Sequence, residues 1–283
     1  NQQGQDWGMP PWHPRALVEQ GYAPLRDLVR SLVRHAGGVR IDHVLGMFRL
    51  WWIPEGATAR GGTYVSYDAE ALLGVIALEA ERAGAVVVGE DLGTVPDHVR
   101  GALAERGILG NSVLWFERED GEPGITGALR PMHEWRDAAM ASVTTHDLPT
   151  ALAWLRGDVV HVRAEKGLLD DPVEEARRWR AERDELLAHL VASGVLDSVD
   201  APEDELVRAL HIYVASTPSR YVVAAPGDAV GDLRQPNLPG TIDEYPNWRL
   251  PVADSSGRPL LLDELLADPR VARLAADLDR NVR

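Results

Sequence analysis

The 283-residue chain contains no cysteine, which excludes a disulfide framework and any metal site built from thiolates. It also lacks an apolar run of the roughly 18 residues that a membrane span needs, and its first residues have neither the basic start nor the apolar core of a signal peptide. Lysine and arginine number 29 against 44 acidic residues, giving a net charge of -15. Nucleic acid binding needs concentrated basic side chains. These absences predict a soluble, cytoplasmic protein with no membrane or nucleic acid partner.

Short apolar runs alternate with helical patterns along the chain, and a 45% hydrophobic composition is enough for a sizeable core. Such alternation predicts an α/β fold with parallel strands joined by right-handed crossovers. Strands are expected near residues 39–43, 86–89, 112–116, 141–145 and 220–225. Helices are expected at about 14–36, 68–83, 96–106, 127–139, 157–196, 203–215 and 259–280.

These five strands are fewer than the eight that a closed (β/α) barrel requires. An open half-barrel would leave an unpaired strand edge, so the chain is expected to be the latter part of a longer protein. The fold class predicted is a partial (β/α) TIM-type barrel, strands 4 to 8 with their helices, carrying a helical insertion. Residues 1–156 are expected to form a barrel segment, 157–215 a charged helical insertion, and 216–283 the last strand, a long loop and C-terminal helices.

Three acids, Asp42, Glu90 and Asp147, each follow a short apolar run, in VRIDHV, VVVGEDLG and SVTTHDLP. A parallel barrel displays its catalytic side chains on the loops after its strands, and the chemistry of glycosidic bonds needs paired carboxylates. Acids far apart in the sequence are therefore expected to meet in one pocket.

Each acid has a catalytic and a structural interpretation. Arg40 and Asp42 share a strand face, and a neighbouring guanidinium should keep Asp42 ionised, as a nucleophile must be; alternatively, the two form a plain ion pair. The apolar residues before Glu90 favour a protonated general acid, unless Glu90 caps a helix, a role that suits Asp91 better. Asp147 fits an N-cap equally well.

Two histidines, His43 and His146, adjoin two of these acids and raise the alternative of a metal site. The sequence has no His-x-His or His-Glu-x-x-His spacing, no Gly-rich phosphate loop and no Gly-x-Ser-x-Gly elbow. No metal and no cofactor are therefore expected. Nine tryptophans either stack on sugar faces or fill the core. The aromatic stretches Trp7–Trp12 and Phe48–Trp52 are expected to be loops, and so is the long segment through Trp248.

Several motifs in this sequence resemble those of one known family. They are GQDWGMP, RIDHVLGMFRLWWIPEG, VVGEDLGTVP, TTHDLPT and NLPGT with PNW, which extend from the first residues to about 251. Together they resemble the amylomaltases, or 4-α-glucanotransferases, bacterial relatives of the plant disproportionating enzyme in the α-amylase clan. The pairing of RIDHVLG with GEDLGTVP is specific, far beyond a single short pattern.

The resemblance implies a (β/α) barrel enzyme that transfers α-1,4-glucan segments between maltodextrins by a retaining double displacement. It assigns Asp42 as nucleophile, Glu90 as acid/base and Asp147 as the acid that binds and distorts the sugar. It also implies substrate contacts from six further residues: Gln5, Trp7, Arg40, His43, His146 and Asn247. Two alternatives stay open, an α-1,4-glucan hydrolase of the same clan and an inactive glucan-binding fragment without the first barrel strands.

Overall fold

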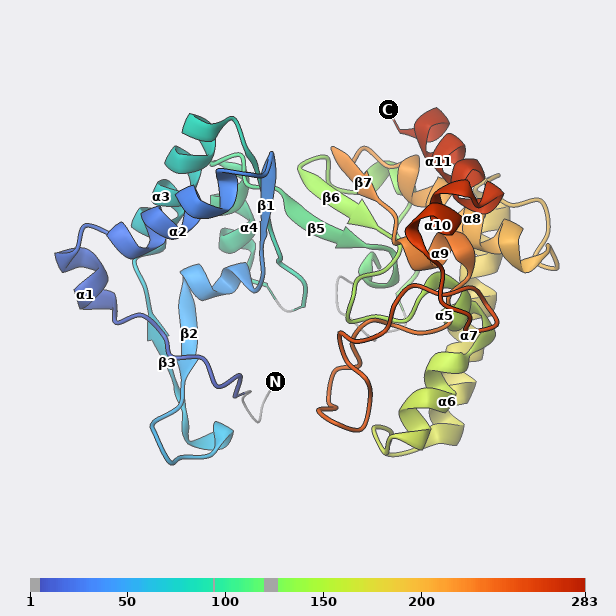
Figure 1. The fold of residues 1–283 in the computed structure, drawn as a ribbon, viewed down its shortest axis with the longest axis horizontal. Helices are drawn as coiled ribbons and strands as arrows, with labels where there is room; N and C mark the ends of the chain where they lie inside the picture. The colour runs from blue at the N-terminus through green and yellow to red at the C-terminus, as the bar shows by residue number, and fades with distance from the viewer. Residues whose placement is uncertain (1–5, 94, 120–126, 283) are drawn as a thin grey trace. The chain divides into compact units, whose positions relative to one another are not determined.

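The computed structural model describes residues 6–93, 95–119 and 127–282, and its ribbon is drawn in Figure 1. The chain divides into two compact units, Asn1–Asn111 and Ser112–Arg283, here called unit 1 and unit 2. Each unit has its own hydrophobic core. Gln5, one of the expected substrate contacts, lies outside the described residues.

Unit 1 combines helices with two small sheets. Its helices and strands are α1 (Pro14–Glu19), α2 (Ala23–Val33), β1 (Gly38–Ile41), β2 (Arg49–Trp52), β3 (Thr63–Ser66), α3 (Ala69–Ala83), β4 (Val86–Gly89) and α4 (Asp97–Ala104). Strands β1 and β4 pair in parallel, with Ile41 opposite Gly89, and a parallel bridge joins Val88 to Leu109. Helices α2 and α3 pack together, and their apolar faces contribute Val29 and Ile76 to the core.

The predicted helix at 14–36 is wrong as a single element. It is two helices, α1 and α2, because Gly21 and Tyr22 adopt φ values of 55° and 56°. A left-handed residue cannot continue a right-handed α-helix. Glycine takes this conformation without steric cost, so the chain turns here.

Residues 49–66 form a β-hairpin where the sequence predicted an aromatic loop. Arg49 pairs with Ser66 and Trp52 with Thr63, antiparallel. The ring of Trp51 lies edge-on to that of Tyr64, with 5.0 Å between centroids. Such cross-strand aromatic pairs stabilise a sheet. The hairpin was missed because its two strands are short and separated by a long connection rich in glycine.

Unit 2 is larger and mostly helical. Its elements are β5 (Gly110–Val113), β6 (Ala139–Ser142), α5 (Ala151–Arg156), α6 (Asp158–Glu165), α7 (Pro172–Ala192), α8 (Glu203–Ala215), β7 (Tyr221–Val223), α9 (Pro226–Val230), α10 (Leu262–Ala267) and α11 (Pro269–Asn281). Strand β5 begins two residues before the boundary between the units. Its sheet has the order β5-β6-β7, and β6 and β7 pair in parallel.

The expected mixed α/β fold is confirmed. The five predicted strands correspond to β1, β4, β5, β6 and β7, with ends that differ by up to three residues. Within the described residues, however, the strands form short separate sheets and no closed barrel.

The helix expected near 127–139 is wrong. The described part of this stretch contains only a short 3-10 helix, Met132–Glu134, directly after Pro131. Proline cannot donate the backbone hydrogen bond that an α-helix requires in its interior. Trp135 is instead buried, and its indole N–H donates to the carbonyl of Arg130 at 3.2 Å.

The charged region at 157–196 is two helices, α6 and α7. Asp171 is the N-cap of α7: its carboxylate accepts hydrogen bonds from the backbone N–H groups of Val173 and Glu174, both at 3.0 Å. The first half of α7 is charged, whereas Leu187 and Leu190 near its end lie in the core of unit 2. Burial of these leucines stabilises the packing of α7 against α8.

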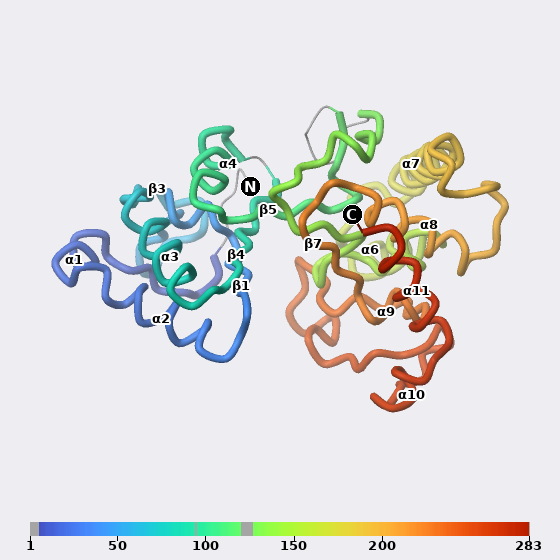
Figure 2. Tube along the Cα trace, turned by 90° about the horizontal axis from the view of Figure 1, so that it is seen from above, coloured from blue at the N-terminus to red at the C-terminus, as the bar shows by residue number. Residues whose placement is uncertain are grey.

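The last helix, α11, packs against α8 and α9, as Figure 2 shows. Asp277 of α11 is 2% exposed, and the Arg208 guanidinium donates to it at 2.6 Å from α8. Arg208, and after it Arg280, hold the pKa of Asp277 below its usual value. The buried ion pair therefore holds α11 against α8.

We expect Asp277→Asn to lower the free energy of unfolding by about 3 kcal/mol at neutral pH, because one partner of a buried ion pair is lost. A carboxyl with a lowered folded-state pKa stabilises the fold fully above its unfolded pKa, about 3.9, and loses this contribution as the pH falls through the folded-state pKa. Urea unfolding measured from pH 7 to pH 3 should therefore show that the difference in unfolding free energy between Asp277→Asn and the unmodified chain becomes smaller as the pH falls. Asp279→Asn, on the exposed side of α11, is the control, and equal stability of both variants at pH 7 would contradict the assignment.

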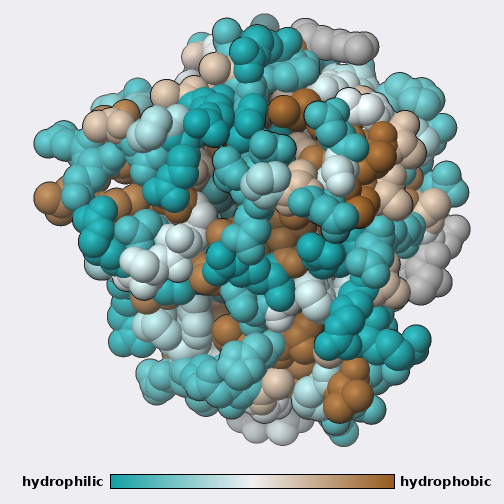
Figure 3. Space-filling view, turned by 90° about the vertical axis from the view of Figure 1, so that its right-hand side faces the viewer, coloured by the Kyte–Doolittle hydropathy of each residue, from teal (hydrophilic) through white to brown (hydrophobic). Residues whose placement is uncertain are grey.

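Hydrophilic residues predominate on the face of the molecule in Figure 3, where hydrophobic residues form separate patches. In the part of the chain that the structure describes, no helix is long and apolar enough to cross a membrane.

Candidate active site

Asp42 directly follows β1, and its carboxylate faces Arg40. The Arg40 Nη1 to Asp42 Oδ1 distance is 2.6 Å, so the predicted placement of both side chains on one strand face is confirmed. The Asp42 side chain is 73% exposed and that of Arg40 only 29%. The arginine thus orients the carboxylate from the protein side and leaves it open to an approaching ligand.

Glu90 directly follows β4, and two backbone N–H groups hold its carboxylate. His43 N–H donates to Oε2 and Leu92 N–H to Oε1, each at 2.8 Å. The Glu90 N–H in turn donates to the carbonyl of Ile41 at 2.8 Å. Because β1 and β4 run in parallel, Asp42 and Glu90 emerge at the same end of the pair. The structure therefore brings these two acids together.

The helix-capping interpretation of this segment is wrong. Helix α4 begins at Asp97 with Pro96 as its N-cap, so neither Glu90 nor Asp91 caps it. Asp91 is 1% exposed, and its Oδ1 accepts a hydrogen bond from the backbone N–H of Asn111 at 2.8 Å. Asp91 thus holds the start of β5. The Glu90 carboxylate caps no helix.

Gly89 allows the close approach that positions Glu90. A Cβ atom at Gly89 would lie 2.9 Å from a methyl carbon of Val44, a fully buried residue. Val44 also donates its backbone N–H to the carbonyl of Glu90 at 3.0 Å. Any larger residue at position 89 would therefore push the end of β4 away from the segment that contains Val44.

His43 lies between the two acids in a strained backbone conformation. Its φ of 48° is in the left-handed region, which costs a residue other than glycine on the order of 1 kcal/mol. This conformation accompanies the hydrogen bond from its N–H to Glu90. The Trp7 ring lies edge-on to the His43 ring, with 5.0 Å between centroids, and Trp7 is 58% exposed. An exposed indole beside His43, which follows Asp42 in the chain and donates to Glu90, suits contact with a sugar ring.

Asp147 lies in unit 2, in the turn between β6 and α5. The turn is closed by Thr144, whose hydroxyl donates to the carbonyl of Pro149 at 2.7 Å. The N-cap of α5 is Thr150, whose hydroxyl accepts the backbone N–H of Ala153 at 3.3 Å. The interpretation of Asp147 as an N-cap is therefore wrong, and its carboxylate is available for other contacts.

Asn237 holds the Asp147 carboxylate, a contact that sequence reasoning missed. Its side-chain N–H donates to Asp147 Oδ1 at 2.6 Å, and its backbone N–H donates to the carbonyl of His146 at 3.1 Å. Gln235 donates to the carbonyl of Asn237 at 2.6 Å. The only sequence signal for Asn237 was its place in the NLPGT motif. The long loop after α9 thus fixes the third acid.

His146 and Asn247 both belong to this part of unit 2. The His146 Nε2 is 3.5 Å from Asp147 Oδ2, and its ring lies 5.1 Å from that of Trp248. Asn247 accepts the backbone N–H of Leu238 at 2.8 Å and donates to the Thr241 hydroxyl at 2.9 Å. Its amide therefore holds the loop closed, and its expected contact with substrate stays a prediction.

The predicted residues thus form two groups, each within its own unit. Unit 1 contributes Trp7, Arg40, Asp42, His43 and Glu90, and unit 2 contributes His146, Asp147 and Asn247. Asp42 and Glu90 thus stand at the same end of two paired parallel strands, and a pair of carboxyl residues is what double displacement at a glycosidic bond uses. Among the described residues, no three His, Asp or Glu side chains are arranged to hold a metal ion.

A family model described as 4-alpha-glucanotransferase, Glyco_hydro_77, matches residues 1–255. The chain belongs to the 4-alpha-glucanotransferase family. It is 52% identical over 277 residues to the 4-alpha-glucanotransferase of Mycobacterium tuberculosis H37Rv, with 97% of this chain covered. The 4-alpha-glucanotransferase of Haemophilus influenzae is 35% identical over 260 residues, 87% of this chain. The family resemblance that the motifs indicated is therefore confirmed.

A solved structure supports the same assignment. The crystal structure of amylomaltase from Corynebacterium glutamicum matches 98% of this chain with a TM-score of 0.89 and 43% sequence identity. This chain spans 40% of that chain. It likewise spans 38% of the M. tuberculosis 4-alpha-glucanotransferase and 36% of that from H. influenzae. The chain therefore spans less than half the length of each of these three relatives.

Proposed function

We propose that this chain carries the catalytic acids of a 4-alpha-glucanotransferase that moves α-1,4-glucan segments between maltodextrins with retention of configuration. The observation that carries the proposal is the pairing of Asp42 and Glu90 at the same end of two parallel strands, fixed by the His43 N–H. A retaining mechanism needs two carboxyl groups about 5–5.5 Å apart. The family membership of the chain supports the choice of α-1,4-glucan as substrate.

Asp42 is proposed as the nucleophile. Its carboxylate attacks the anomeric carbon of the donor sugar, the glycosidic C–O bond breaks, and a covalent glucosyl-enzyme forms. Arg40, at 2.6 Å, orients the attacking carboxylate. The exposed position of Asp42 supports this role because substrate can reach it.

Glu90 is proposed as the acid and base. In the first step its proton goes to the departing glycosidic oxygen; in the second it accepts the proton of the acceptor hydroxyl as that oxygen attacks the anomeric carbon. The two backbone N–H groups that hold Glu90 support the role because proton transfer requires a fixed geometry. The acceptor is a second glucan rather than water.

Asp147 is proposed to bind and distort the donor sugar. Substrate contacts are proposed for Gln5, Trp7, Arg40, His43, His146 and Asn247. The exposed rings of Trp7 and Trp248, at 58% and 65%, support aromatic contacts with sugar. The reaction needs neither a metal nor a cofactor.

We also propose that β1, β4, β5, β6 and β7 are strands 4 to 8 of a (β/α) barrel, with 157–215 as a helical insertion between 1–156 and 216–283. The parallel pairs β1-β4 and β6-β7 support this assignment, and so does the similarity to the amylomaltase of C. glutamicum. In such a barrel, Asp42, Glu90 and Asp147 all follow strands, where catalytic residues gather.

Incubation with maltotriose tests the function. Transfer should give glucose together with a ladder of longer maltodextrins, because one maltotriose acts as acceptor for another. Shortening alone would reject transfer in favour of an α-1,4-glucan hydrolase. Binding without any turnover would reject catalysis by this chain and leave a glucan-binding fragment.

We expect Asn237→Ala to lower kcat about 100-fold with little change in KM, because a catalytic group displaced by an ångström loses that much. Chain-length analysis of maltotriose products over time gives both constants. Ser256→Ala is the matched control, since it removes one hydrogen bond of the same loop, from the Ser256 hydroxyl to Asp254 at 2.6 Å, without touching Asp147. If both variants lose the same activity, Asn237 acts only through the order of the loop.

A further inference from the structure

The region of α9 holds the start of α5, directly after the turn that carries Asp147. Asp228 Oδ1, on α9, accepts the backbone N–H of Ala151 at 2.7 Å. The carbonyl of Asp232, just past the end of α9, accepts the hydroxyl of Thr150 at 2.5 Å. All four of these holding residues are buried, so water does not compete for either contact.

These contacts act on the residues that follow Asp147 most closely. Ala151 is the first residue of α5, so its N–H has no acceptor within the helix. Asp228 supplies that acceptor. At the other end of the turn, the Thr144 hydroxyl donates to the carbonyl of Pro149 at 2.7 Å. The turn is therefore closed by its own threonine and anchored to α9 at the point where α5 begins.

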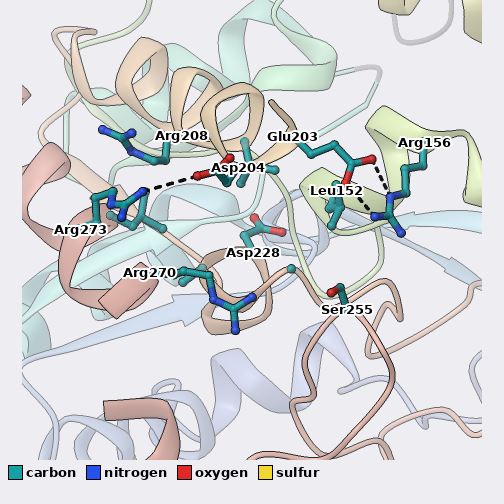
Figure 4. A pocket seen from close by; sticks show the side chains of 13 residues that line it. Leu152, Arg156, Glu203, Asp204, Arg208, Asp228, Ser255, Arg270 and Arg273 are labelled. Atoms are coloured by element: carbon teal, nitrogen blue, oxygen red, sulfur yellow. Dashed lines mark hydrogen bonds and ion pairs between the residues drawn. The ribbon is translucent and has the colours of Figure 1, made fainter. Parts of the chain in front are cut away.

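Asp228 is in turn held by a buried histidine of α8. It lies in the middle of the side chains drawn around a cavity in Figure 4, but its own side chain is 0% exposed and that of His211 1%. The four arginines of the figure are paired with other carboxylates: Arg156 with Glu203, Arg273 with Asp204, Arg208 with Asp277, and Arg270 with Asp268. His211 Nε2, at 3.3 Å, is the group that faces Asp228 Oδ2.

One proton is needed between His211 and Asp228. His211 Nδ1 lies 2.9 Å from the carbonyl of Val207, and because a carbonyl only accepts, this nitrogen carries a hydrogen. Among the described residues, neither His211 Nε2 nor Asp228 Oδ2 has another hydrogen-bond partner. Without a proton between them, two buried acceptors would face each other at a cost in free energy. With one, the contact is attractive and fixes the direction of the carboxylate.

We infer that Asp228 and His211 are positioning residues for Asp147. They are too deeply buried to touch a substrate. They fix the first turn of α5 and, through residues 148–150, the backbone of Asp147, whereas Asn237 holds its carboxylate. The effect on turnover rests on the proposed function, but the effect on the turn does not.

A second buried pair separates positioning from mere stability. Asp277 of α11 is paired with Arg208 of α8 at 2.6 Å and is 2% exposed on its side chain. This pair joins α8 to α11 and not to the turn that carries Asp147. Asp277→Asn therefore destabilises the same unit without removing the acceptor of the Ala151 N–H.

Two substitutions of Asp228 test the inference. Asp228→Ala removes the acceptor of the Ala151 N–H and should lower kcat for maltotriose about 10–100-fold with little change in KM, the effect of a displaced catalytic group. Asp228→Asn keeps an oxygen for Ala151 and offers an N–H to His211, so its kcat should stay close to that of the unmodified chain. Asp277→Asn, the control, should also keep its kcat although its stability is lower.

Amide hydrogen exchange followed by mass spectrometry tests the turn without any need for turnover. Peptides covering 148–156 should exchange at least about tenfold faster in Asp228→Ala, as the loss of a hydrogen bond to a charged group predicts. They should be unchanged in Asp228→Asn and Asp277→Asn. If the unmodified chain fails to convert maltotriose, the proposed function fails alone, and the exchange rates still decide whether Asp228 holds the turn.

The double variant Asp228→Ala/His211→Leu covers the case in which Asp228→Ala does not fold. Replacing both partners with apolar side chains avoids an unpaired buried histidine but still leaves the Ala151 N–H without its acceptor. Slow turnover and fast exchange at 148–156 should therefore persist. Exchange at the unmodified rate in this variant or in folded Asp228→Ala would overturn the inference. An equal loss of kcat in Asp277→Asn would do so too, because turnover would then follow stability.

Discussion

Asp42→Asn is expected to lower turnover of maltotriose by at least about 10⁴-fold, in line with the loss of other catalytic nucleophiles. An amide is nearly isosteric with the carboxylate but cannot form the covalent glucosyl-enzyme. Because the Asp42 side chain is 73% exposed, the fold should be unaffected. Product analysis measures the rate, and thermal unfolding monitored by circular dichroism checks the fold.

Asp27→Asn is the matched control for this variant. Like Asp42, Asp27 is an exposed aspartate of unit 1 with an arginine partner, Arg26, at 2.8 Å. Loss of that ion pair should leave activity and melting temperature unchanged, since exposed ion pairs contribute little. Near-normal turnover by Asp42→Asn would refute its role as nucleophile, whatever the control does.

Glu90→Gln is expected to lower turnover of maltotriose by about 10²–10⁴-fold, the usual contribution of a general acid or base. The loss should be clearly smaller for formation of the glucosyl-enzyme from a maltosyl donor with a good leaving group, such as fluoride, because that group departs without a proton. Pre-steady-state release of the leaving group isolates this first step.

Two comparisons keep this prediction falsifiable. Glu81→Gln, an exposed glutamate on α3, should behave like the unmodified chain with both donors. Equal losses of Glu90→Gln with maltotriose and with the activated donor would count against proton transfer by Glu90. Its side chain would then be important only for holding the His43 and Leu92 N–H groups.

The parts of the fold that were predictable depend on local patterns. The run Val86–Gly89 is apolar and β-branched, which identifies a buried strand from a few residues, and its bounds match the structure. The N-cap at Asp171 is an equally local feature, because a capping acid accepts hydrogen bonds from the backbone of its own neighbours. The break between α1 and α2 was missed because a single glycine, Gly21, is a weak stop signal and the left-handed Tyr22 beside it is not a residue type that marks such a turn.

The candidate site was predictable only in part, because local patterns identify its acids but not the residues that hold them. Asp42, Glu90 and Asp147 stand out because each follows an apolar run. Their partners come from elsewhere in the chain: Asn237 reaches Asp147 across 90 residues. No periodicity links positions so far apart. Contacts of this kind depend on how loops fold back over strands, which only coordinates reveal.

The Asn237–Asp147 hydrogen bond has a consequence for chimeric enzymes built by exchanging segments between relatives. A transplanted segment covering residues 231–261 brings its own residue at position 237. That residue then decides whether the hydrogen bond to Asp147, which belongs to the recipient, is kept. Grafts that retain asparagine there should keep the position that the Asp147 carboxylate has in the recipient. Grafts without it should need a compensating donor before new product profiles can be attributed to the transplanted loop.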